Sequence, residues 1–358
     1  MNNYKETYFD KRNVSNTMRM REIMKDLPDF CYDFFVGIEN QTSPLTRLNY
    51  AYDLRIFFYF LFNETNLFIG KDIYSLEVVD LEKINANHLE RYVSFLSNYT
   101  ISGKTCSNGE RGKSRKIASV RTFFKYFFKK ELLSKNVASK IDMPKIHEKS
   151  IVRLEVDEVA KIITTAEKGY NLSPREKAFN KHTALRDTAL LTLLLGTGIR
   201  ISECVGINIE DIDFSINGLK ITRKGGNQVV LYFSDEVKKA LVDYLDVRTN
   251  PIITNVSKEE RSLFLSMQKK RISPRAVQFL VKKYAKVVTP LKKITPHKLR
   301  STYGTALYRE TQDIYIVADV LGHKDVNTTK KHYAAISDDI RRTASTKVRL
   351  RDLDNTGE

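Results

Sequence analysis

The sequence has few cysteines and no long apolar segment. Three cysteines occur among its 358 residues, and they lie far apart, without the close spacing of metal ligands. This pattern excludes a disulfide framework and favours a reducing, cytoplasmic location. No apolar run reaches the about 18 residues that a membrane-spanning helix needs. The first residues, MNNYKETYFDKRN, are too polar for a secretory signal, so we expect no membrane partner.

Acidic residues are scarce relative to basic ones. The chain has 60 Lys and Arg against 43 Asp and Glu, which gives a net charge of +17 at pH 7. A basic excess of this kind favours a polyanionic partner. The basic residues are spread over many expected helices and form no amphipathic anchor, which favours nucleic acid over a membrane surface. On charge alone, a basic protein without a polyanionic partner stays open as an alternative.

Apolar periodicity predicts a mostly α-helical first part. Residues 1–40 are weakly patterned and are expected to form an extension with one helix. Helices are expected at 43–63, 81–98 and 115–133, where apolar residues recur at helical spacing. Residues 100–114 are rich in Gly, Ser and Thr, a composition typical of a loop.

The second part is expected to combine helices with one small sheet. A helix at 155–167 is followed by an irregular insertion at 168–182 and by an apolar helix that ends at Gly196. Residues 219–222 and 228–233 alternate like strands around a turn at Gly225 and Gly226. The expected N-terminal caps of later helices are Ser234, Ser273 and Thr295, the last two each followed by proline.

Several polar residues follow apolar elements in a suggestive order. The segment GTGIRISE places Arg200 at a turn after two glycines, with Glu203 three residues further on. In TPHKLR, His297 and Arg300 lie three apart near a helix N-terminus, where phosphate binds readily. Lys224 lies in the hairpin turn, and His323 follows Gly322, the expected residue after a helix end. Taken singly, each is more often a surface ion-pair partner, a solvated cation or a helix cap.

Taken in order with Tyr333, these residues resemble the tyrosine recombinases of the lambda-integrase and Xer type. The matching segments are GTGIRISE, TRKGGNQ, PHKLRSTYGTAL, VLGHKDVNTT and the HY pair that ends at Tyr333. The resemblance covers residues 155–335 strongly and the N-terminal helices more loosely. Tyr333 follows His323 by ten residues, one more than is common in Xer-type enzymes, and His332 at the shorter spacing cannot form a phosphotyrosine. Tyr303, Tyr308 and Tyr315 precede His323 and do not fit the order.

The resemblance implies both an architecture and a set of roles. The fold is expected to be mostly α with a small β-hairpin or sheet: an all-helical, SAM-like N-terminal DNA clamp and an α+β catalytic domain. The implied catalytic residues are Arg200, Lys224, His297, Arg300, His323 and the nucleophile Tyr333, with Glu203 orienting a neighbouring group rather than reacting. Neither a metal ion nor another cofactor is expected, because the arginines supply the positive charge. The candidate DNA-binding residues of the N-terminal domain are Thr46, Arg47, Tyr50, Ser114, Arg115, Lys116 and Arg121.

The expected organisation has five parts and a DNA partner. They are an extension at 1–40, a core-binding domain at 41–145, a linker at 146–154, a catalytic domain at 155–340 and a tail at 341–358 that protomers exchange. The resemblance implies double-stranded DNA as substrate, a dimer on each site and a tetramer in the synapse. We expect integration or excision of a mobile element. Chromosome dimer resolution, relaxation of the type IB topoisomerase kind and a DNA-binding protein without catalysis are the alternatives.

Overall fold

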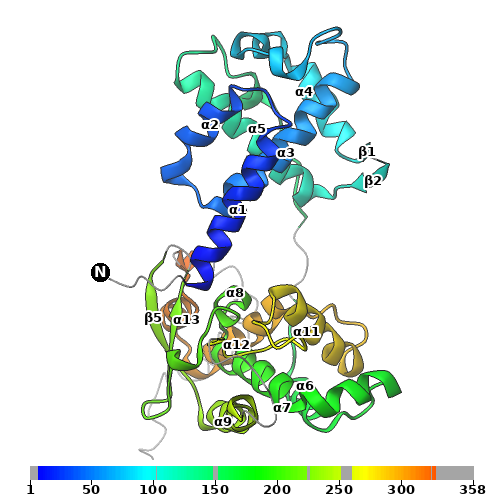
Figure 1. Ribbon diagram of the computed structural model, residues 1–358. Helices are drawn as coiled ribbons and strands as arrows, with labels where there is room; N and C mark the ends of the chain where they lie inside the picture. The colour runs from blue at the N-terminus through cyan, green and yellow to red at the C-terminus, as the bar shows by residue number, and fades with distance from the viewer. Residues whose placement is uncertain are drawn as a thin grey trace, which may run out of the picture. The chain divides into compact units, whose positions relative to one another are not determined.

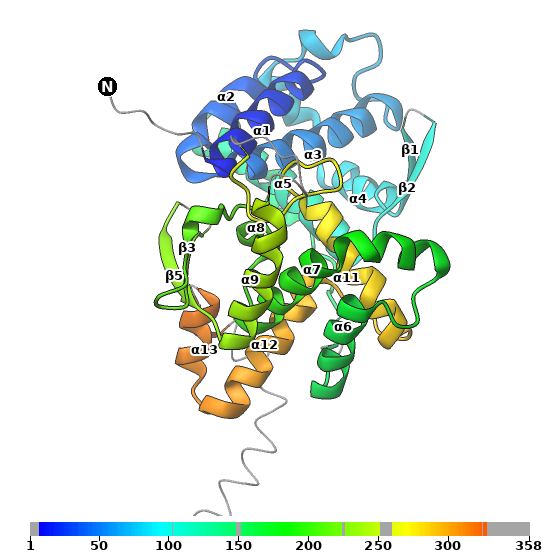
Figure 2. The ribbon, with the colours of Figure 1, turned by 60° about the horizontal axis from the view of Figure 1, so that its bottom comes forward.

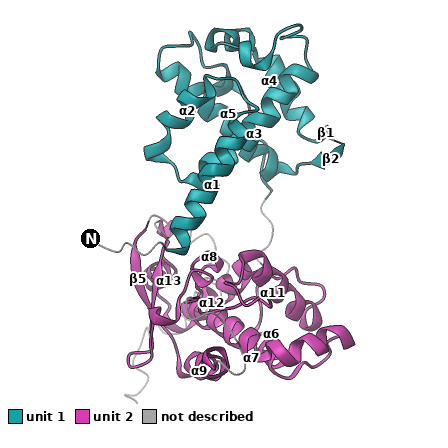
Figure 3. Cartoon of the chain, in the orientation of Figure 1, with its two compact units in different colours: residues 1–149 teal, residues 150–358 magenta. Residues whose placement is uncertain are grey.

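The computed structural model describes residues 7–101, 103–147, 152–223, 226–250, 260–323 and 325–327. The chain divides into two compact units, unit 1 at residues 1–149 and unit 2 at residues 150–358 (Figures 1 and 3). Most described residues are helical, and the strands form two small antiparallel sheets. The predicted fold class is therefore confirmed. None of the described helices combines the length and the apolar character needed to cross a membrane.

Unit 1 is a helical bundle with an aromatic core. Its elements are α1 (Tyr8–Met24), α2 (Cys31–Gly37), α3 (Pro44–Asn63), α4 (Ala86–Phe95), β1 (Asn98–Ile101), β2 (Lys104–Ser107) and α5 (Glu110–Lys129), with short 3-10 turns between them. Ser43 caps α3 through the N–H of Thr46, as a serine before a proline-started helix commonly does. The apolar stripe of α5 is buried and packs with aromatic residues of α2 and α3. Burial of these rings is the main source of stability for unit 1.

Three boundaries of unit 1 differ from the prediction. The first 40 residues hold two helices, α1 and α2, and Phe34 and Phe35 of α2 are core residues rather than part of a loose extension. The helix expected at 81–98 begins only at Ala86, after a 3-10 turn at Val78–Lys83, because Asn85 caps it. The loop expected at 100–114 is instead the β1–β2 hairpin, in which Thr100 pairs with Thr105, followed by the start of α5.

Unit 2 is built around the long helix α7. Its elements are α6 (Val156–Lys168), α7 (Pro174–Thr197), α8 (Ile201–Cys204), β3 (Ile212–Asp213), β4 (Gly218–Thr222), β5 (Gln228–Tyr232), α9 (Asp235–Thr249), α11 (Pro274–Val288), α12 (Pro296–Thr311) and α13 (Ile314–Leu321). Helices α6, α9 and α12 all contact α7 (Figure 2). The strands form an antiparallel sheet in the order β3-β4-β5, and Leu219 of β4 pairs with Leu231 of β5.

Helix α7 begins earlier than the sequence pattern predicts. The segment expected to be irregular up to residue 182 becomes helical at Pro174. Ser173 accepts a hydrogen bond from the N–H of Glu176, and the Glu176 carboxylate accepts one from the N–H of Ser173. This reciprocal cap starts a helix despite the polar composition of its first turns. The expected helix starts at Ser234, Ser273 and Thr295 are confirmed, although only Ser273 accepts a backbone hydrogen bond through its side chain.

Candidate active site

The turn after α7 presents Arg200. Gly198 ends α7 in the left-handed conformation, with φ of 61°, which favours glycine. A Cβ atom at Gly198 would lie 2.5 Å from Cδ1 of Tyr303 and 2.9 Å from Cδ2 of Leu321. Only glycine therefore lets this turn approach α12 and α13 so closely. Arg200 follows two residues later as the N-terminal cap of the short helix α8.

Glu203 holds Arg200 by two contacts. The Arg200 backbone N–H donates to Oε2 of Glu203 at 3.0 Å, and its Nη1 donates to Oε1 at 2.9 Å. The Glu203 side chain is only 3% exposed, whereas that of Arg200 is 34% exposed. A buried carboxylate thus orients a guanidinium that still reaches the surface. This contact gives the sequence-predicted orienting residue a concrete partner.

Arg300 is buried and bridges two turns. It lies in the second turn of α12 and is 6% exposed. Its Nη1 donates to the carbonyl oxygen of Gly198 at 2.6 Å, and its Nη2 donates to the carbonyl oxygen of Leu321. Because a guanidinium is planar and stays charged at any working pH, these contacts fix both its place and its orientation. His297, one turn earlier on α12, is exposed.

The C-terminal end of α13 is where these groups meet. Gly322 adopts the left-handed conformation there, and the N–H of His323 donates back to the Ala318 carbonyl oxygen at 2.9 Å. The Gly322 carbonyl oxygen accepts Nη2 of Arg200 at 2.9 Å, next to the Leu321 carbonyl that accepts Arg300. Carbonyls at a helix end lack partners within the helix and carry partial negative charge. The structure therefore brings together Arg200, Arg300, Glu203 and the backbone of His323.

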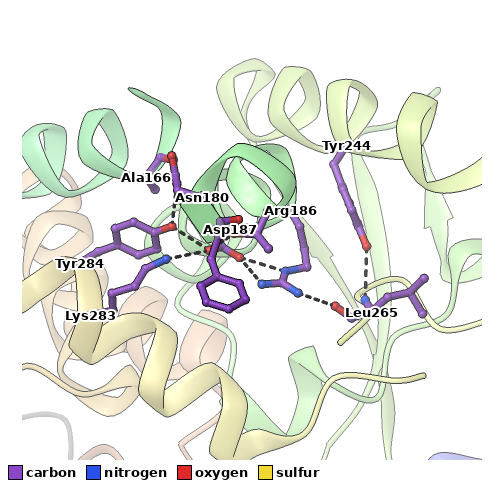
Figure 4. A network of polar contacts seen from close by, with 10 residues as sticks. Ala166, Asn180, Arg186, Asp187, Tyr244, Leu265, Lys283 and Tyr284 are labelled. Atoms are coloured by element: carbon purple, nitrogen blue, oxygen red, sulfur yellow. Dashed lines mark hydrogen bonds and ion pairs between the residues drawn. The ribbon is translucent and has the colours of Figure 1, made fainter. Parts of the chain in front are cut away.

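A buried polar network holds α7, the helix that leads to Arg200 (Figure 4). Asp187, 1% exposed, accepts hydrogen bonds from the hydroxyl of Tyr284 at 2.7 Å and from Nε of Arg186 at 2.9 Å. Lys283 lies 3.4 Å from the same carboxylate, and Arg186 also donates to the Leu265 carbonyl oxygen at 2.9 Å. Burial, with the nearby Asp187 charge, raises the pKa of Tyr284, so its hydroxyl stays a proton donor. The network joins α7 to α11 and to the segment around Leu265.

Two predicted catalytic residues lie outside the described residues. These are Lys224, which follows β4, and Tyr333, which follows α13. The same holds for the tail at 341–358. Sequence reasoning missed Arg223, whose guanidinium also reaches the end of α13. Its position directly before Lys224 was the one available signal.

The candidate DNA-binding residues of unit 1 differ in their surroundings. Arg47 is 4% exposed and donates to the carbonyl oxygen of Glu39 at 2.9 Å. Lys116 is 7% exposed and donates to Oδ1 of Asn108 at 2.9 Å, and desolvation lowers its pKa. Both side chains therefore make their contacts within unit 1. The remaining candidates are at least partly exposed, although Arg115 also pairs with Asp53; they are Thr46, Tyr50, Ser114, Arg115 and Arg121.

Comparison with known proteins identifies the class. Residues 152–339, more than half of the chain, match the model of the phage integrase family. The chain therefore belongs to the phage integrase family and is, by class, a tyrosine recombinase, as its motifs predict.

Two curated relatives are similar over most of their length. The chain is 34% identical to the tyrosine recombinase XerC of Caldanaerobacter subterraneus subsp. tengcongensis, over 80% of this chain and 77% of that protein. It is 32% identical to XerC of Thermodesulfovibrio yellowstonii, over 71% of this chain and 80% of that protein.

Solved structures share the fold at lower identity. The XerH site-specific recombinase bound to a palindromic difH substrate matches with a TM-score of 0.59 at 17% identity, over 92% of this chain and 94% of that one. A lambda integrase dimer bound to a COC' core site matches with a TM-score of 0.57 at 16% identity, over 92% of this chain and 81% of that one.

Proposed function

We propose that the protein cleaves and rejoins double-stranded DNA at a specific site through a 3′-phosphotyrosine intermediate. The observation that carries the proposal is the convergence of Arg200 and Arg300 on the carbonyls of Leu321 and Gly322, directly before His323. Two fixed guanidinium groups on one helix end match the needs of a phosphodiester under attack. The attack places extra negative charge on the nonbridging oxygens, and planar donors already in place stabilise that charge without reorganisation.

The remaining roles follow from the family order. The Tyr333 oxygen attacks phosphorus, a P–O bond to tyrosine forms, and the bond between phosphorus and the deoxyribose 5′-oxygen breaks. Lys224 gives a proton to the departing 5′-oxygen, so that it leaves as a hydroxyl. Because an unperturbed tyrosine has a pKa of about 10, its proton must pass to a base, and His297 is the candidate. His323 donates to the phosphate.

Religation reverses the chemistry on a different strand. A free 5′-hydroxyl attacks the phosphotyrosine, which restores the phosphodiester and returns Tyr333 to its free form. Since the phosphotyrosine conserves the energy of the broken bond, no nucleotide cofactor is required. Two rounds of such exchange pass through a Holliday junction. The arginines supply the positive charge that a metal ion supplies in other phosphoryl-transfer sites.

The partners are DNA and further copies of the chain. The net charge of +17 supports a polyanionic substrate. We assign the core-binding role to unit 1 and the catalytic role to unit 2, with a dimer on each site and a tetramer in the synapse. The tail at 341–358 is the segment that protomers would exchange. A cytoplasmic location is in line with three unpaired cysteines, Cys31, Cys106 and Cys204.

Integration or excision of a mobile element is the favoured biological role. The spacing between His323 and Tyr333, together with the β1–β2 hairpin and the polar start of α7, supports it. Chromosome dimer resolution is the second candidate, because the relatives named above carry the name XerC. The two roles differ in the DNA that is recombined.

The test uses supercoiled plasmids carrying two copies of a candidate site. One plasmid carries the sequence flanking the chain's own gene, another carries a chromosomal dimer-resolution site, and a third carries neither. We expect deletion or inversion products from the first plasmid only. Products from the second plasmid alone would favour chromosome dimer resolution. Relaxation of all three without rearrangement would indicate topoisomerase activity, and binding without either product would contradict the proposed catalysis.

A further inference from the structure

We infer that Arg223 is a positioning residue for Lys224, because it anchors the end of β4 to the same helix end that holds Arg200 and Arg300. The inference rests on the proposed function and deepens it. Its starting observation is that the Arg223 guanidinium crosses from the hairpin to α13. Nη2 of Arg223 donates to the Val320 carbonyl oxygen at 2.9 Å. Both terminal nitrogens lie 3.4 Å from the carbonyl oxygen of Asp319.

The backbone of Arg223 is also fixed. Its N–H donates to the Asn227 carbonyl oxygen at 2.8 Å, and its own carbonyl accepts the N–H of Gly226 at 3.1 Å. These two bonds close the turn between β4 and β5 at the residue that carries the α13 contact. Lys224 is the next residue in the sequence, so we expect loss of the Arg223 contacts to affect the proton transfer proposed for it.

Three arginines donate hydrogen bonds to the last carbonyl groups of α13 and to that of Gly322, which follows it. Asp319 and Val320 accept Arg223, Leu321 accepts Arg300, and Gly322 accepts Arg200. The three arginines come from the hairpin, from α12 and from the turn between α7 and α8. The residue before the proposed proton donor and the two arginines proposed to bind phosphate thus share one helix end as their anchor. Catalytic rates respond steeply to displacements of about 1 Å, so a common anchor has a chemical consequence.

Gly322 provides independent support for this close approach. A Cβ atom at Gly322 would overlap Nη1, Cζ and Nε of Arg223. The guanidinium therefore lies against the bare face of the glycine, and a larger residue there would displace it. Arginine suits the contact better than lysine, because its planar group can span two neighbouring carbonyls.

The test distinguishes variants that have lost the proton donor from variants that have lost binding of the phosphate. Two nicked duplexes of the cleaved sequence are compared, one with the natural 5′-oxygen and one with 5′-sulfur at the scissile bond. A thiol has a pKa of about 8.5, far more acidic than an alcohol, so sulfur leaves without a proton. The variants are Arg223→Ala, Lys224→Ala and the double variant. Lys220→Ala, which removes one charge from an exposed position of β4, is the matched control.

We expect Arg223→Ala to slow formation of the covalent adduct on the oxygen substrate about 10- to 100-fold. On the sulfur substrate its rate should stay within about threefold of wild type, and the double variant should be no slower than Lys224→Ala. Lys220→Ala should cleave both substrates as the wild type does. Equal slowing of Arg223→Ala on both substrates, or no slowing, would overturn the inference. Failure of the proposed function is distinguishable, because the wild type itself would then form no adduct.

Discussion

Arg200 and Arg300 donate to adjacent carbonyl oxygens, those of Gly322 and Leu321. Arg200 is 122 residues away from its acceptor in the chain, and Arg300 also bridges to Gly198, the residue that ends α7. The end of α13 therefore holds two guanidinium groups in fixed places through backbone contacts. Under the proposed function, such an arrangement needs little reorganisation when a phosphate binds, which is the condition for strong electrostatic stabilisation.

Arg300→Lys should impair both catalysis and stability. Lysine keeps the charge but cannot reach the carbonyls of Gly198 and Leu321 in one plane. We expect adduct formation to fall about 10²- to 10³-fold and the free energy of unfolding to fall by about 1–3 kcal/mol. Single-turnover cleavage and urea unfolding measure the two effects. Arg309→Lys, on the same helix but half-exposed, is the control and should match wild type; an unaffected Arg300→Lys would contradict the assigned role.

Asp187→Asn should destabilise unit 2. The substitution removes a buried charge that faces Arg186 and Lys283 and accepts the Tyr284 hydroxyl. Leaving these partners uncompensated should lower the free energy of unfolding by about 3–5 kcal/mol. The urea midpoint of unit 2 reports the loss. Asp157→Asn removes an exposed pair with Lys161 and should leave the urea midpoint nearly unchanged, because solvent screens such a pair. Similar losses for both variants would argue against the network in Figure 4.

The two lysines beside Asp80 predict a pH-dependent contribution to the stability of unit 1. Lys71 lies 2.8 Å and Lys83 lies 2.8 Å from Oδ1 of Asp80, and these hydrogen bonds lower the pKa of Asp80 below its usual value. Because the pKa of Asp80 is lower in the folded state, its carboxylate stabilises the fold at pH values above its unfolded-state pKa of about 3.9. This stabilisation is lost as the pH falls through the folded-state pKa. Asp80→Asn should therefore lower the free energy of unfolding by about 1–2 kcal/mol near neutral pH.

The test of this contribution is a pair of urea titrations across the acid range. The difference between wild type and Asp80→Asn should shrink as the pH falls below about 4. Asp72→Asn serves as the comparison, because Asp72 caps a 3-10 turn and has no such lysine pair among the described contacts. A difference for Asp80→Asn that stays constant down to about pH 3 would show that its carboxylate is not held by the lysines.

The three cysteines should react at different rates with a thiol reagent. Burial raises the pKa of the Cys204 thiol to about 12 and also raises that of Cys31. Because the thiolate is the reactive form, both should be silent in the native state. Cys106, half-buried on β2, should be the one that is labelled. Cys106→Ser should abolish native labelling and leave two thiols reactive after unfolding; fast labelling of this variant while folded would contradict the burial of Cys31 and Cys204.

Sequence patterns predicted most helices but not the backbone contacts that hold the arginines of the site. The apolar periodicity of α3 and α5 and the cap at Ser273 are local signals, so α3, α5 and α11 could be located from the sequence. The β1–β2 hairpin could not, because Gly, Ser and Thr are equally typical of loops. The roles of Arg200 and Arg300 were predicted through family resemblance. Their shared anchor on α13 was not, since contacts to backbone carbonyls leave no mark on residue types.

The DNA-binding residues show another limit of sequence reasoning. A basic residue on a helix looks the same in sequence whether it faces DNA or an internal partner. Lys116 contacts Asn108 and Arg47 contacts Glu39 within unit 1, and neither contact follows from helical periodicity. Burial of a charged group depends on which partner the fold supplies, and that partner comes from another element.

The most direct test of the central claim is the covalent adduct on a nicked suicide duplex. The duplex is built from the sequence flanking the gene, and the products are resolved on a denaturing gel before and after protease treatment. We expect a slowly migrating, protease-sensitive band with the wild type and with Tyr315→Phe, which changes an exposed tyrosine outside the motif order. We expect no band with Tyr333→Phe. A band that persists in Tyr333→Phe would contradict the assignment of the nucleophile.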